Sequence, residues 1–461
     1  MNEQTPSHTS AQNKAAIIRA IESQSADDCI AWFDASPMAD IVHDVAALST
    51  HQRTKLLALL PTESAAEIVE QLPFSQTTDV LEELEPSAAA QILEVLPSDE
   101  CADIISELDE AAASAILDKL DAAVADDLRR LVAYDEESAG GLMLTEYLAF
   151  VETQTVADVI ADLTTNAEKY AKYNIQYTYV VDKEAKLMGV VPLRRLLLAG
   201  RNTLLREVMI ANPVSVVDQM ELQPLASVFR EHPYMGLPVT TLDGVLRGVV
   251  ERSAVEHALT EEADDLYRQS QGIVGGEELR SMPLMLRSRR RLAWLSANIV
   301  LNMIAASVIA MHQDTLSAVI ALAVFLPMIS DMSGCSGNQA VAVSMRELTL
   351  GVTRPQDLLR VLMKESSVGL INGVVLGVLI GCVASIWQGS PMLGVVVGGA
   401  LMINTVVAVC IGGSIPLVLK RFKLDPALAS GPILTTVTDM CGFLLALTFA
   451  SMLLTQVPPS A

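Results

Sequence analysis

Basic residues are scarce in the first 284 positions of this 461-residue chain. That part carries 48 acidic but only 20 basic residues, whereas positions 285–461 carry 11 basic and 7 acidic residues. Such a shortage of positive charge argues against nucleic acid as a partner, because phosphate backbones are bound mainly by Lys and Arg. The carboxylates also repel one another unless cations neutralise them. The two parts predict an acidic soluble region followed by a membrane region.

Other common signals are missing as well. The six cysteines form no CxxC pair, which predicts that they are unpaired. Residues 133–258 contain neither a glycine-rich phosphate loop nor a nucleophile motif. The first segment, MNEQTPSHTSAQNK, lacks the basic-then-apolar order of a signal peptide, so we expect the soluble region to lie in the cytoplasm.

Residues 45–132 contain a repeat with a period of 12. Two apolar positions recur in each repeat, and Pro or Asp often follows the leucine, as at a helix boundary. Short helices of this kind bury their apolar faces only by stacking, so residues 1–132 are predicted to form an all-α solenoid. Its acidic surface suits either a scaffold or a cation-sensitive docking face. The two registers are Leu60, Leu72, Leu84, Leu96, Leu108 and Leu120, and Ile68, Val80, Ile92, Ile104, Ile116 and Leu128.

Residues 133–258 have a different rhythm. The stretch QYTYVVDKEAKLMGVVPLRRLLLA is typical of strand, turn, strand and helix, and GLPVTTLDGVLRGVVERSAVEHAL repeats that order about 60 residues later. A duplicated β-α unit predicts a tandem regulatory module rather than an enzyme. Residues 259–284 are expected to form an acidic helix, a glycine pair and a second short helix that leads to the membrane.

The last region, 285–461, predicts five membrane spans. Each is long enough to cross the roughly 20-residue thickness of a bilayer core. With five spans, the basic clusters that flank them all fall on the side of the N-terminal region, as the positive-inside rule requires. The expected spans are about 292–312, 315–340, 366–387, 392–419 and 427–454.

Two acidic residues lie within these spans, Asp331 in the second and Asp439 in the fifth. Ionisable groups in hydrocarbon are costly and usually mark an ion path. For Asp331 a structural role is the alternative, because Pro327, Gly334 and Gly337 favour a bent or broken helix. For Asp439 an ion-path role is favoured, because no basic residue lies deep in the spans to neutralise it.

Hard oxygen donors accompany these carboxylates and suit Mg²⁺, Ca²⁺ or Mn²⁺ better than Zn²⁺ or Cu⁺. Mg²⁺ usually keeps several waters and is held by one or two carboxylates, which a single aspartate in a polar pore could supply. In a homodimer with the pore on its axis, Asp439 would be doubled. The predicted lining candidates are Asp331, Asn338, Asn404, Thr435, Thr436 and Thr438, with Ser333, Ser336, Gln339 and Thr405 as further polar residues.

With these residues in view, the chain resembles the MgtE family of magnesium transporters and channels over almost its whole length. The resemblance implies a superhelical N domain, a tandem CBS pair, a plug helix and a five-helix membrane domain in a homodimer. The family's fifth-helix motif places its aspartate on Asp439, which from both subunits would hold a hydrated Mg²⁺. The supporting motifs are YDEESAGGLM (134–143), YTYVVDKEAKLMGVVPLRRLL (177–197), EEADDLYRQSQGI (261–273), FLPMISDMSGCSGNQA (325–340) and DPALASGPILTTVTDMCG (425–442).

The resemblance also implies a gate. Mg²⁺ bound among cytosolic carboxylates would hold the pore closed, and repulsion between them would open it when internal Mg²⁺ falls. The plug motif places sensor residues on Glu261, Asp264 and Asp265, and we add Asp99 and Asp103 for their charge and helical spacing. CBS units can also bind ATP. The expected setting is the cell membrane, with the N-terminal domains in the cytoplasm.

Three departures from the family pattern affect these expectations. Cys335 replaces an asparagine in the second span, where its thiol either packs or favours a softer ion such as Mn²⁺ or Co²⁺; we expect packing. The end of the second CBS unit, GVVERSAVEHAL, lacks a paired acidic motif common in relatives, so one sensor position is expected to be missing. Asp314 stands where relatives tend to carry glutamate.

Two rival classes differ from a Mg²⁺ pathway. An aspartyl intramembrane protease would use both aspartates, but its GxGD-type motif is absent, and we expect no enzyme. A membrane-anchored sensor of cations or nucleotides would bind without transport, although polar residues on at least three spans argue against it. A transporter of Mn²⁺ or Co²⁺ remains the alternative within the transport class.

Overall fold

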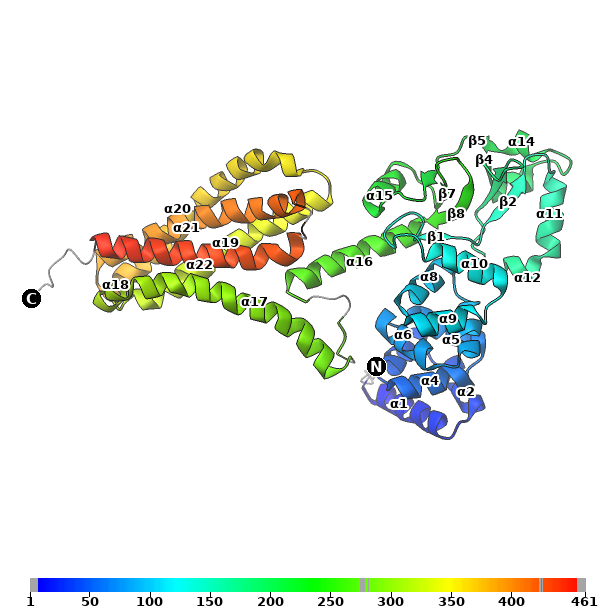
Figure 1. Ribbon diagram of the computed structural model, residues 1–461, viewed down its shortest axis with the longest axis horizontal. Coiled ribbons are helices and arrows are strands. Elements are labelled where there is room, and N and C mark those ends of the chain that lie inside the picture. The colour runs from blue at the N-terminus through cyan, green and yellow to red at the C-terminus, as the bar shows by residue number, and fades with distance from the viewer. Residues whose placement is uncertain are drawn as a thin grey trace, which may run out of the picture. The chain divides into compact units, whose positions relative to one another are not determined.

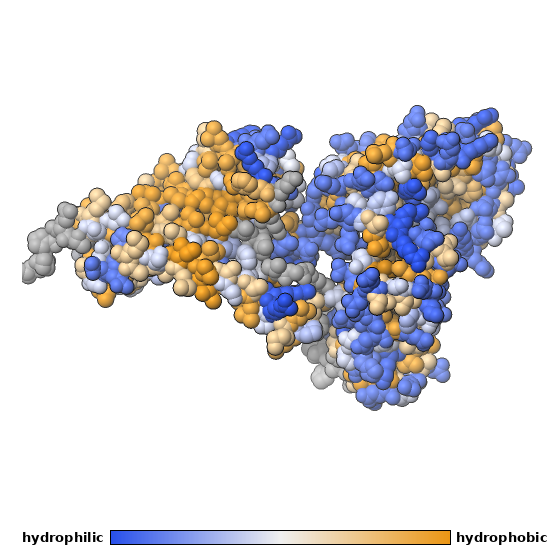
Figure 2. Space-filling model, in the orientation of Figure 1, coloured by the Kyte–Doolittle hydropathy of each residue, from blue (hydrophilic) through white to orange (hydrophobic). Residues whose placement is uncertain are grey.

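The computed structural model describes residues 7–171, 173–273, 278–280, 282–422, 424 and 426–453. The chain divides into two compact units, Met1–Glu262 and Ala263–Ala461, and each is described by itself. Figure 1 shows short helices and two small sheets in the first unit and long helices in the second. Figure 2 shows hydrophobic residues spread over the long helices and hydrophilic residues over most of the first unit.

The first unit begins with stacked short helices, as the 12-residue repeat predicted. Beyond α1, each of them has 8 to 10 residues. The stack also extends further toward the N-terminus than the repeat. The helices are α1 (Ser7–Glu22), α2 (Ala26–Ala35), α3 (Met38–Ala46), α4 (Thr50–Leu59), α5 (Thr62–Gln71), α6 (Phe74–Glu83), α7 (Pro86–Leu93), α8 (Ser98–Glu107), α9 (Glu110–Leu117) and α10 (Ala122–Leu131).

Both registers of the repeat are buried. The leucine register is 6–8% exposed and the second register 0–4% exposed. Leu72 caps the C-terminus of α5 with extended backbone (φ −75°, ψ 149°), and Pro73 follows it. Because a residue before proline is disfavoured in the α-region, the Leu-Pro step ends one helix and starts the next. The solenoid prediction is confirmed in both its helix lengths and its core.

Two four-stranded sheets follow the solenoid, in the orders β2-β3-β4-β5 and β1-β8-β7-β6. In each, a parallel pair (β2 with β3, β6 with β7) adjoins an antiparallel pair (β3 with β4, β7 with β8). The duplicated unit is therefore confirmed. The strands are β1 (Met143–Leu144), β2 (Leu148–Val151), β3 (Tyr177–Val181), β4 (Leu187–Pro192), β5 (Ile210–Ala211), β6 (Val216–Val217), β7 (Gly236–Thr240) and β8 (Leu246–Glu251), and the helices are α11 (Val156–Thr165), α12 (Ala167–Tyr170), α13 (Leu193–Leu198), α14 (Leu205–Val208) and α15 (Leu222–Glu231).

The acidic helix of the connecting region is longer than predicted. Helix α16 (Arg252–Ser270) starts directly after β8 and includes the whole acidic stretch. The predicted glycine pair, Gly275 and Gly276, lies outside the described residues.

The second short helix of that region is a wrong prediction for the residues that the structure describes. Residues 278–280, 282 and 283 are not helical, and α17 (Leu284–Met311) begins after Pro283. The carboxylate of Glu278 instead pairs with Arg287 at 3.5 Å and with Arg291, which ties this segment to the first turns of α17. Two arginines of the basic run therefore hold the connecting segment.

The second unit contains five helices of 28 or more residues. Four of them are long and apolar enough to cross a membrane on those grounds alone, within Leu284–Met311, Pro355–Gln388, Pro391–Arg421 and Gly431–Leu453. The fifth, α19, has sufficient length, but its polar residues lower its mean hydropathy. The remaining long helices are α19 (Leu322–Thr349), α20 (Leu358–Gln388), α21 (Pro391–Arg421) and α22 (Pro426–Leu453).

The predicted second span, 315–340, is wrong at its start. A separate short helix, α18 (Gln313–Ala318), precedes α19, and the chain between them leaves helical geometry at Val319 (φ −131°, ψ 66°). Helix α19 itself is continuous with Pro327 in its interior, so it is not broken. In Figure 1 the starts of α17, α20 and α22 and the ends of α19 and α21 lie at one end of the bundle. The basic clusters belong to that end, as the five-span prediction required.

Helices α20 and α21 pack backbone to backbone through glycines spaced four residues apart. A Cβ at Gly377 would lie 2.6 Å from the carbonyl oxygen of Gly398, and a Cβ at Gly373 would lie 2.6 Å from that of Met402. Only glycine permits so close an approach. In lipid, where no hydrophobic effect drives helices together, the van der Waals contacts of such close packing stabilise helix association instead.

Candidate functional site

Asp439 lies in α22, partly buried, and its closest polar neighbour belongs to α19. The hydroxyl of Ser330 donates a hydrogen bond to Asp439 Oδ1. Ser330 was not among the predicted residues, although it stands directly before Asp331 in the sequence. No arginine, lysine or histidine forms an ion pair with Asp439 among the described residues. The carboxylate is therefore available to a cation.

A stripe of exposed polar residues runs along α19 beside this position. Asp331, Cys335, Asn338 and Gln339 are spaced as successive turns on one helix face, and all four are exposed in the single chain. Charged and amide groups do not face lipid without partners. This stripe therefore marks a face that water or protein covers. Cys335 is exposed on this face in the single chain, so its thiol does not pack against other residues of the same chain.

The threonines of α22 divide between surface and interior. Thr435, one turn before Asp439, is exposed, whereas Thr436 and Thr438 are buried. Their hydroxyls all donate to carbonyls of their own helix, at 2.8–3.0 Å. A hydroxyl that donates to its own helix can still accept a hydrogen bond, but it lies close to the helix backbone.

Asn404 and Thr405 of α21 lie in the interior of the bundle, both 0% exposed. Thr405 donates to Leu401 in its own helix at 2.8 Å. Asn404 bonds across to α19 and α22, next to Ser333 and Thr438. Of the predicted lining residues, Asp331, Asn338, Thr435 and Asp439 have exposed surface in the chain, and Asn404, Thr436 and Thr438 lie behind them.

A second group of carboxylates gathers in the first unit around α8. Burial, together with the nearby charges of Asp99, Glu136 and Glu261, raises the pKa of Asp103 to about 7. Burial, with the nearby charges of Glu146 and Glu251, likewise raises the pKa of Asp99 to about 6. Like charges in a partly dry site favour the proton, and a divalent cation would relieve the same repulsion. The structure thus brings three predicted sensor residues, Asp99, Asp103 and Glu261, into one electrostatic group.

Glu100 shares α8 with Asp99 and lies one turn before Asp103, and burial together with the nearby charge of Asp99 raises its pKa to about 7. The other members of this acidic group could not be found by helical spacing. Glu136, Glu146 and Glu251 come from the segments before β1 and β2 and from the end of β8. The hydroxyl of Ser98 donates to Glu146 at 2.7 Å, which links the start of α8 to the first sheet unit.

The two remaining sensor candidates lie one turn further along α16. Asp265 pairs with Arg268 of the same helix, whereas Asp264 is exposed. His257 lies 3.7 Å from Glu261. Within the described part of the chain, no three His, Cys, Asp or Glu side chains come close enough together to hold a metal ion. The acidic group therefore suits a hydrated cation or one enclosed after a further closure.

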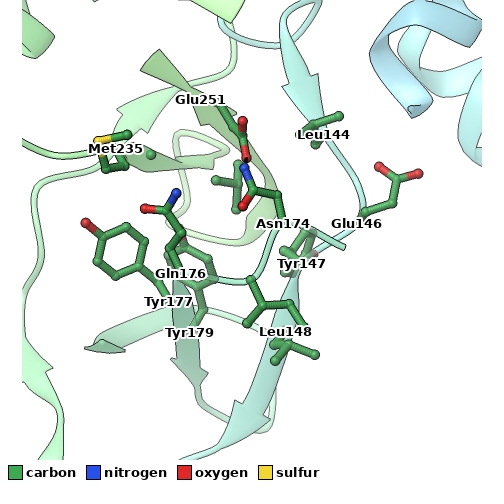
Figure 3. A pocket seen from close by; sticks show the side chains of 13 residues that line it. Leu144, Glu146, Tyr147, Leu148, Asn174, Gln176, Tyr177, Tyr179, Met235 and Glu251 are labelled. Atoms are coloured by element: carbon green, nitrogen blue, oxygen red, sulfur yellow. Dashed lines mark hydrogen bonds between the residues drawn. The ribbon is translucent and has the colours of Figure 1, made fainter. Parts of the chain in front are cut away.

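A cleft between the two sheet units adjoins the acidic group (Figure 3). Its walls carry aromatic rings and amides, and the amide of Asn174 donates to Glu251 at 3.0 Å. Glu146 extends from the rim of the cleft toward Ser98. The lining residues are Leu144, Glu146, Tyr147, Leu148, Asn174, Ile175, Gln176, Tyr177, Tyr179, Met235, Gly236, Val249 and Glu251.

The side chains that line this cleft suit the nucleoside part of a nucleotide but not its phosphates. Tyrosine faces and amides suit a purine ring and a ribose. The described lining contains two glutamates but neither Lys nor Arg, which normally hold phosphates. A free triphosphate therefore lacks a counter-charge here.

Apolar spanning helices with an unpaired intramembrane carboxylate, joined to an acidic soluble unit, define a membrane transport protein for cations. A family described as "Divalent cation transporter" matches residues 326–449, and a second, "MgtE intracellular N domain", matches residues 36–137. The magnesium transporter MgtE of Thermus thermophilus is 34% identical over 73% of this chain and 75% of its own length. That of Enterococcus faecalis is 33% identical over 71% and 72%. The chain belongs to the MgtE family of magnesium transporters, with an intracellular N domain, CBS domains and a transmembrane region.

Among solved structures, the cytosolic domain of the Mg²⁺ channel MgtE in complex with ATP is similar to part of this chain. It is 29% identical, with a TM-score of 0.49, and covers 53% of this chain and 99% of its own. The family is one of transporters, so the protease alternative is set aside.

Proposed function

We propose that this protein imports hydrated Mg²⁺ through a pore on the axis of a homodimer in the cell membrane. The observation that carries the proposal is the exposed polar stripe of α19 (Asp331, Cys335, Asn338 and Gln339) together with the exposed Thr435 and the partly buried Asp439 of α22. Lipid cannot cover such a stripe without large cost. A second copy of the chain would enclose it and would place two Asp439 carboxylates around one path.

The acidic group around α8 supports a gate that responds to cytosolic Mg²⁺. The raised pKa values of Asp99 and Asp103 indicate that these carboxylates repel one another when no cation is present, and the charge of Glu261 contributes to the shift of Asp103. Mg²⁺ binding would neutralise them and favour the closed arrangement, and loss of Mg²⁺ would release it. Asp264 and Asp265 continue the same acidic helix and complete the proposed sensor.

A second candidate is transport of Mn²⁺ or Co²⁺, which the exposed thiol of Cys335 favours. A soft ligand next to Asp331 would add affinity for those ions but not for Mg²⁺. We expect Mg²⁺ to be transported. Cys335→Asn should lower the ratio of Mn²⁺ flux to Mg²⁺ flux by about threefold; a loss of about 1.4 kcal/mol of Mn²⁺ binding would lower it roughly tenfold.

The test is uptake of Mg²⁺, Mn²⁺ and Co²⁺ into proteoliposomes that contain the purified protein, at low and at high internal Mg²⁺. Uptake at low internal Mg²⁺ and shut-off at high internal Mg²⁺ would support the pore and the gate together. Protein-free vesicles and Cys410→Ala, on a different helix, are the controls. No flux of any ion would place the sensor alternative first, and an unchanged flux ratio in Cys335→Asn would remove the thiol from the path.

We also propose that the cleft binds the adenosine part of ATP and accepts the triphosphate as its Mg²⁺ chelate. Without Mg²⁺, adenosine should bind at least about tenfold more tightly than ATP, a difference of about 1.4 kcal/mol. Calorimetric titration of the full protein in chelator and in Mg²⁺ measures this. Glu251→Gln should raise the affinity for free ATP but not for adenosine, whereas Glu207→Gln, exposed on α14, should change neither. Equal affinities for ATP and adenosine in chelator would contradict the proposal.

A further inference from the structure

Asn404 is the polar side chain that joins three membrane helices at the level of Asp439. It lies near the middle of α21 and is 0% exposed. Its amide nitrogen donates to the carbonyl of Thr438 in α22 at 3.0 Å and contacts the hydroxyl of Ser333 in α19. One planar group therefore fixes the distance between the two helices that carry the polar stripe.

Both partners of Asn404 lead directly to the carboxylate. Thr438 is the residue before Asp439, so its carbonyl belongs to the same peptide bond as the Asp439 nitrogen. Ser333 donates to the carbonyls of Ile329 at 2.7 Å and Ser330 at 3.0 Å. Ser330 in turn donates to Asp439 Oδ1. Asn404 thus closes a ring of contacts that passes through the candidate cation ligand.

The surroundings of the amide are shaped to it. A Cβ at Gly442, one turn beyond Thr438, would lie 2.8 Å from the Asn404 nitrogen, so the glycine leaves the space that the amide occupies. Such a fit holds the amide plane in one orientation, because interior side chains in close contact have few alternative rotamers.

The asparagine side chain is only partly satisfied. Its Oδ1 is buried and has no hydrogen-bond partner among the described residues. A buried polar atom without a partner is destabilising, which offsets part of what the two hydrogen bonds of the amide nitrogen contribute. A leucine has the same branching and the same number of side-chain heavy atoms, and it would leave no unpartnered polar atom at this position.

We infer that Asn404 is a positioning residue for the Asp439 cation site. Acting through Thr438 and Ser333, it sets the separation of Asp439 from α19 and thereby the size of the hydrated cation that the site accepts. This inference rests on the proposed function for the transport readouts below, but its geometric readout does not.

The transport experiment compares wild type, Asn404→Leu and Thr405→Val in proteoliposomes. Thr405 is the matched control, because it is adjacent, equally buried and bonded within its own helix. Asn404→Leu should fold with unchanged or higher thermal stability. The variant should raise the Mg²⁺ concentration for half-maximal flux at least about fivefold, where about 1.4 kcal/mol would correspond to tenfold. It should also lower the ratio of Mg²⁺ flux to Mn²⁺ flux. Thr405→Val should change neither quantity.

The geometric experiment introduces Ser330→Cys together with Asp439→Cys, after Cys335, Cys382, Cys410 and Cys441 are replaced by alanine. The rate at which this pair forms a disulfide reports the distance between α19 and α22 without any transport. Adding Asn404→Leu should slow it at least about fivefold, and adding Thr405→Val should not, because disulfides demand close and specific Cβ positions. An unchanged rate in Asn404→Leu would overturn the inference even if the protein transports nothing. Lower stability with unchanged half-saturation and selectivity would also overturn it.

Discussion

Asp439→Asn should abolish Mg²⁺ flux while the protein remains folded. The substitution keeps the shape of the side chain and its contact with Ser330 but removes the charge that would hold a hydrated divalent cation. A charged group in a membrane interior costs several kcal/mol without a partner, so the neutral variant should be at least as stable as wild type. We expect Mg²⁺ flux to fall at least about 100-fold, which corresponds to a loss of at least about 2.8 kcal/mol of interaction with the cation, at about 1.4 kcal/mol for each factor of ten. Proteoliposome uptake, with thermal unfolding of the same preparation, measures both effects.

Thr448→Val is the control for this experiment, because it removes a hydroxyl from the same helix more than two turns away. Its flux should match that of wild type. If Asp439→Asn transports Mg²⁺ at the wild-type rate, the carboxylate does not belong to the path, and Asp331 becomes the remaining acidic candidate. If flux is lost only because the variant is unstable, Asp439 has a structural role.

Neutralising Asp99 and Asp103 together should weaken the shut-off of transport by internal Mg²⁺. Both carboxylates lie in the acidic group around α8, where mutual repulsion makes a divalent cation favourable. With Asp99→Asn and Asp103→Asn, the internal Mg²⁺ concentration for half shut-off should rise by about tenfold or more, equivalent to at least about 1.4 kcal/mol of lost binding. Asp264→Asn with Asp265→Asn should act in the same direction. Flux at a series of internal Mg²⁺ concentrations measures the change.

Glu107→Gln is the matched control, because Glu107 is an exposed carboxylate at the end of the same helix. It should leave the shut-off concentration unchanged. The pH dependence of stability provides a second check. Because the folded state raises the pKa of Asp103 to about 7, it binds that proton more tightly than the unfolded chain does. In Mg²⁺-free buffer the first unit should therefore lose stability as pH rises from about 4 through 7. Asp103→Asn should reduce that loss, and identical pH profiles would contradict the electrostatic account.

The solenoid and the duplicated sheet unit were predictable from the sequence because their signals are periodic and local. Each repeat carries its own helix end, such as the Leu72-Pro73 step, and its own buried positions, so a short window is sufficient. The aspartate in an apolar run was equally visible. Asp439 stands out because almost nothing near it is charged.

The rest depends on contacts between segments that are distant in sequence. The bond from Ser330 to Asp439 spans 109 residues, and the bond from Asn404 to Ser333 spans 71. Neither serine differs in its local pattern from other helix serines. The acidic group likewise draws Glu146 from the segment before β2 and Glu251 from the end of β8, and only the folded sheets bring them near α8. The start of the second long helix was misplaced because the apolar run from Leu316 to Leu326 continues through the break at Val319 without a local signal.

The glycine contacts between α20 and α21 restrict how this membrane domain can deform. Helices joined by side chains can slide or tilt, because rotamers change and fill the gap. Between Gly377 and Gly398 no side chain exists to do so, and separation would leave a slot too narrow for a lipid chain. The two helices therefore have almost no mechanical freedom relative to each other and move as one body. Helix α19 is held to α21 in the same way, because a Cβ at Gly412 would clash with the backbone carbonyl of Gly337. Any change in the width of a path beside Asp439 must therefore come from α22, whose contacts with this body include side chains such as Asn404, and from α17, which packs against α22.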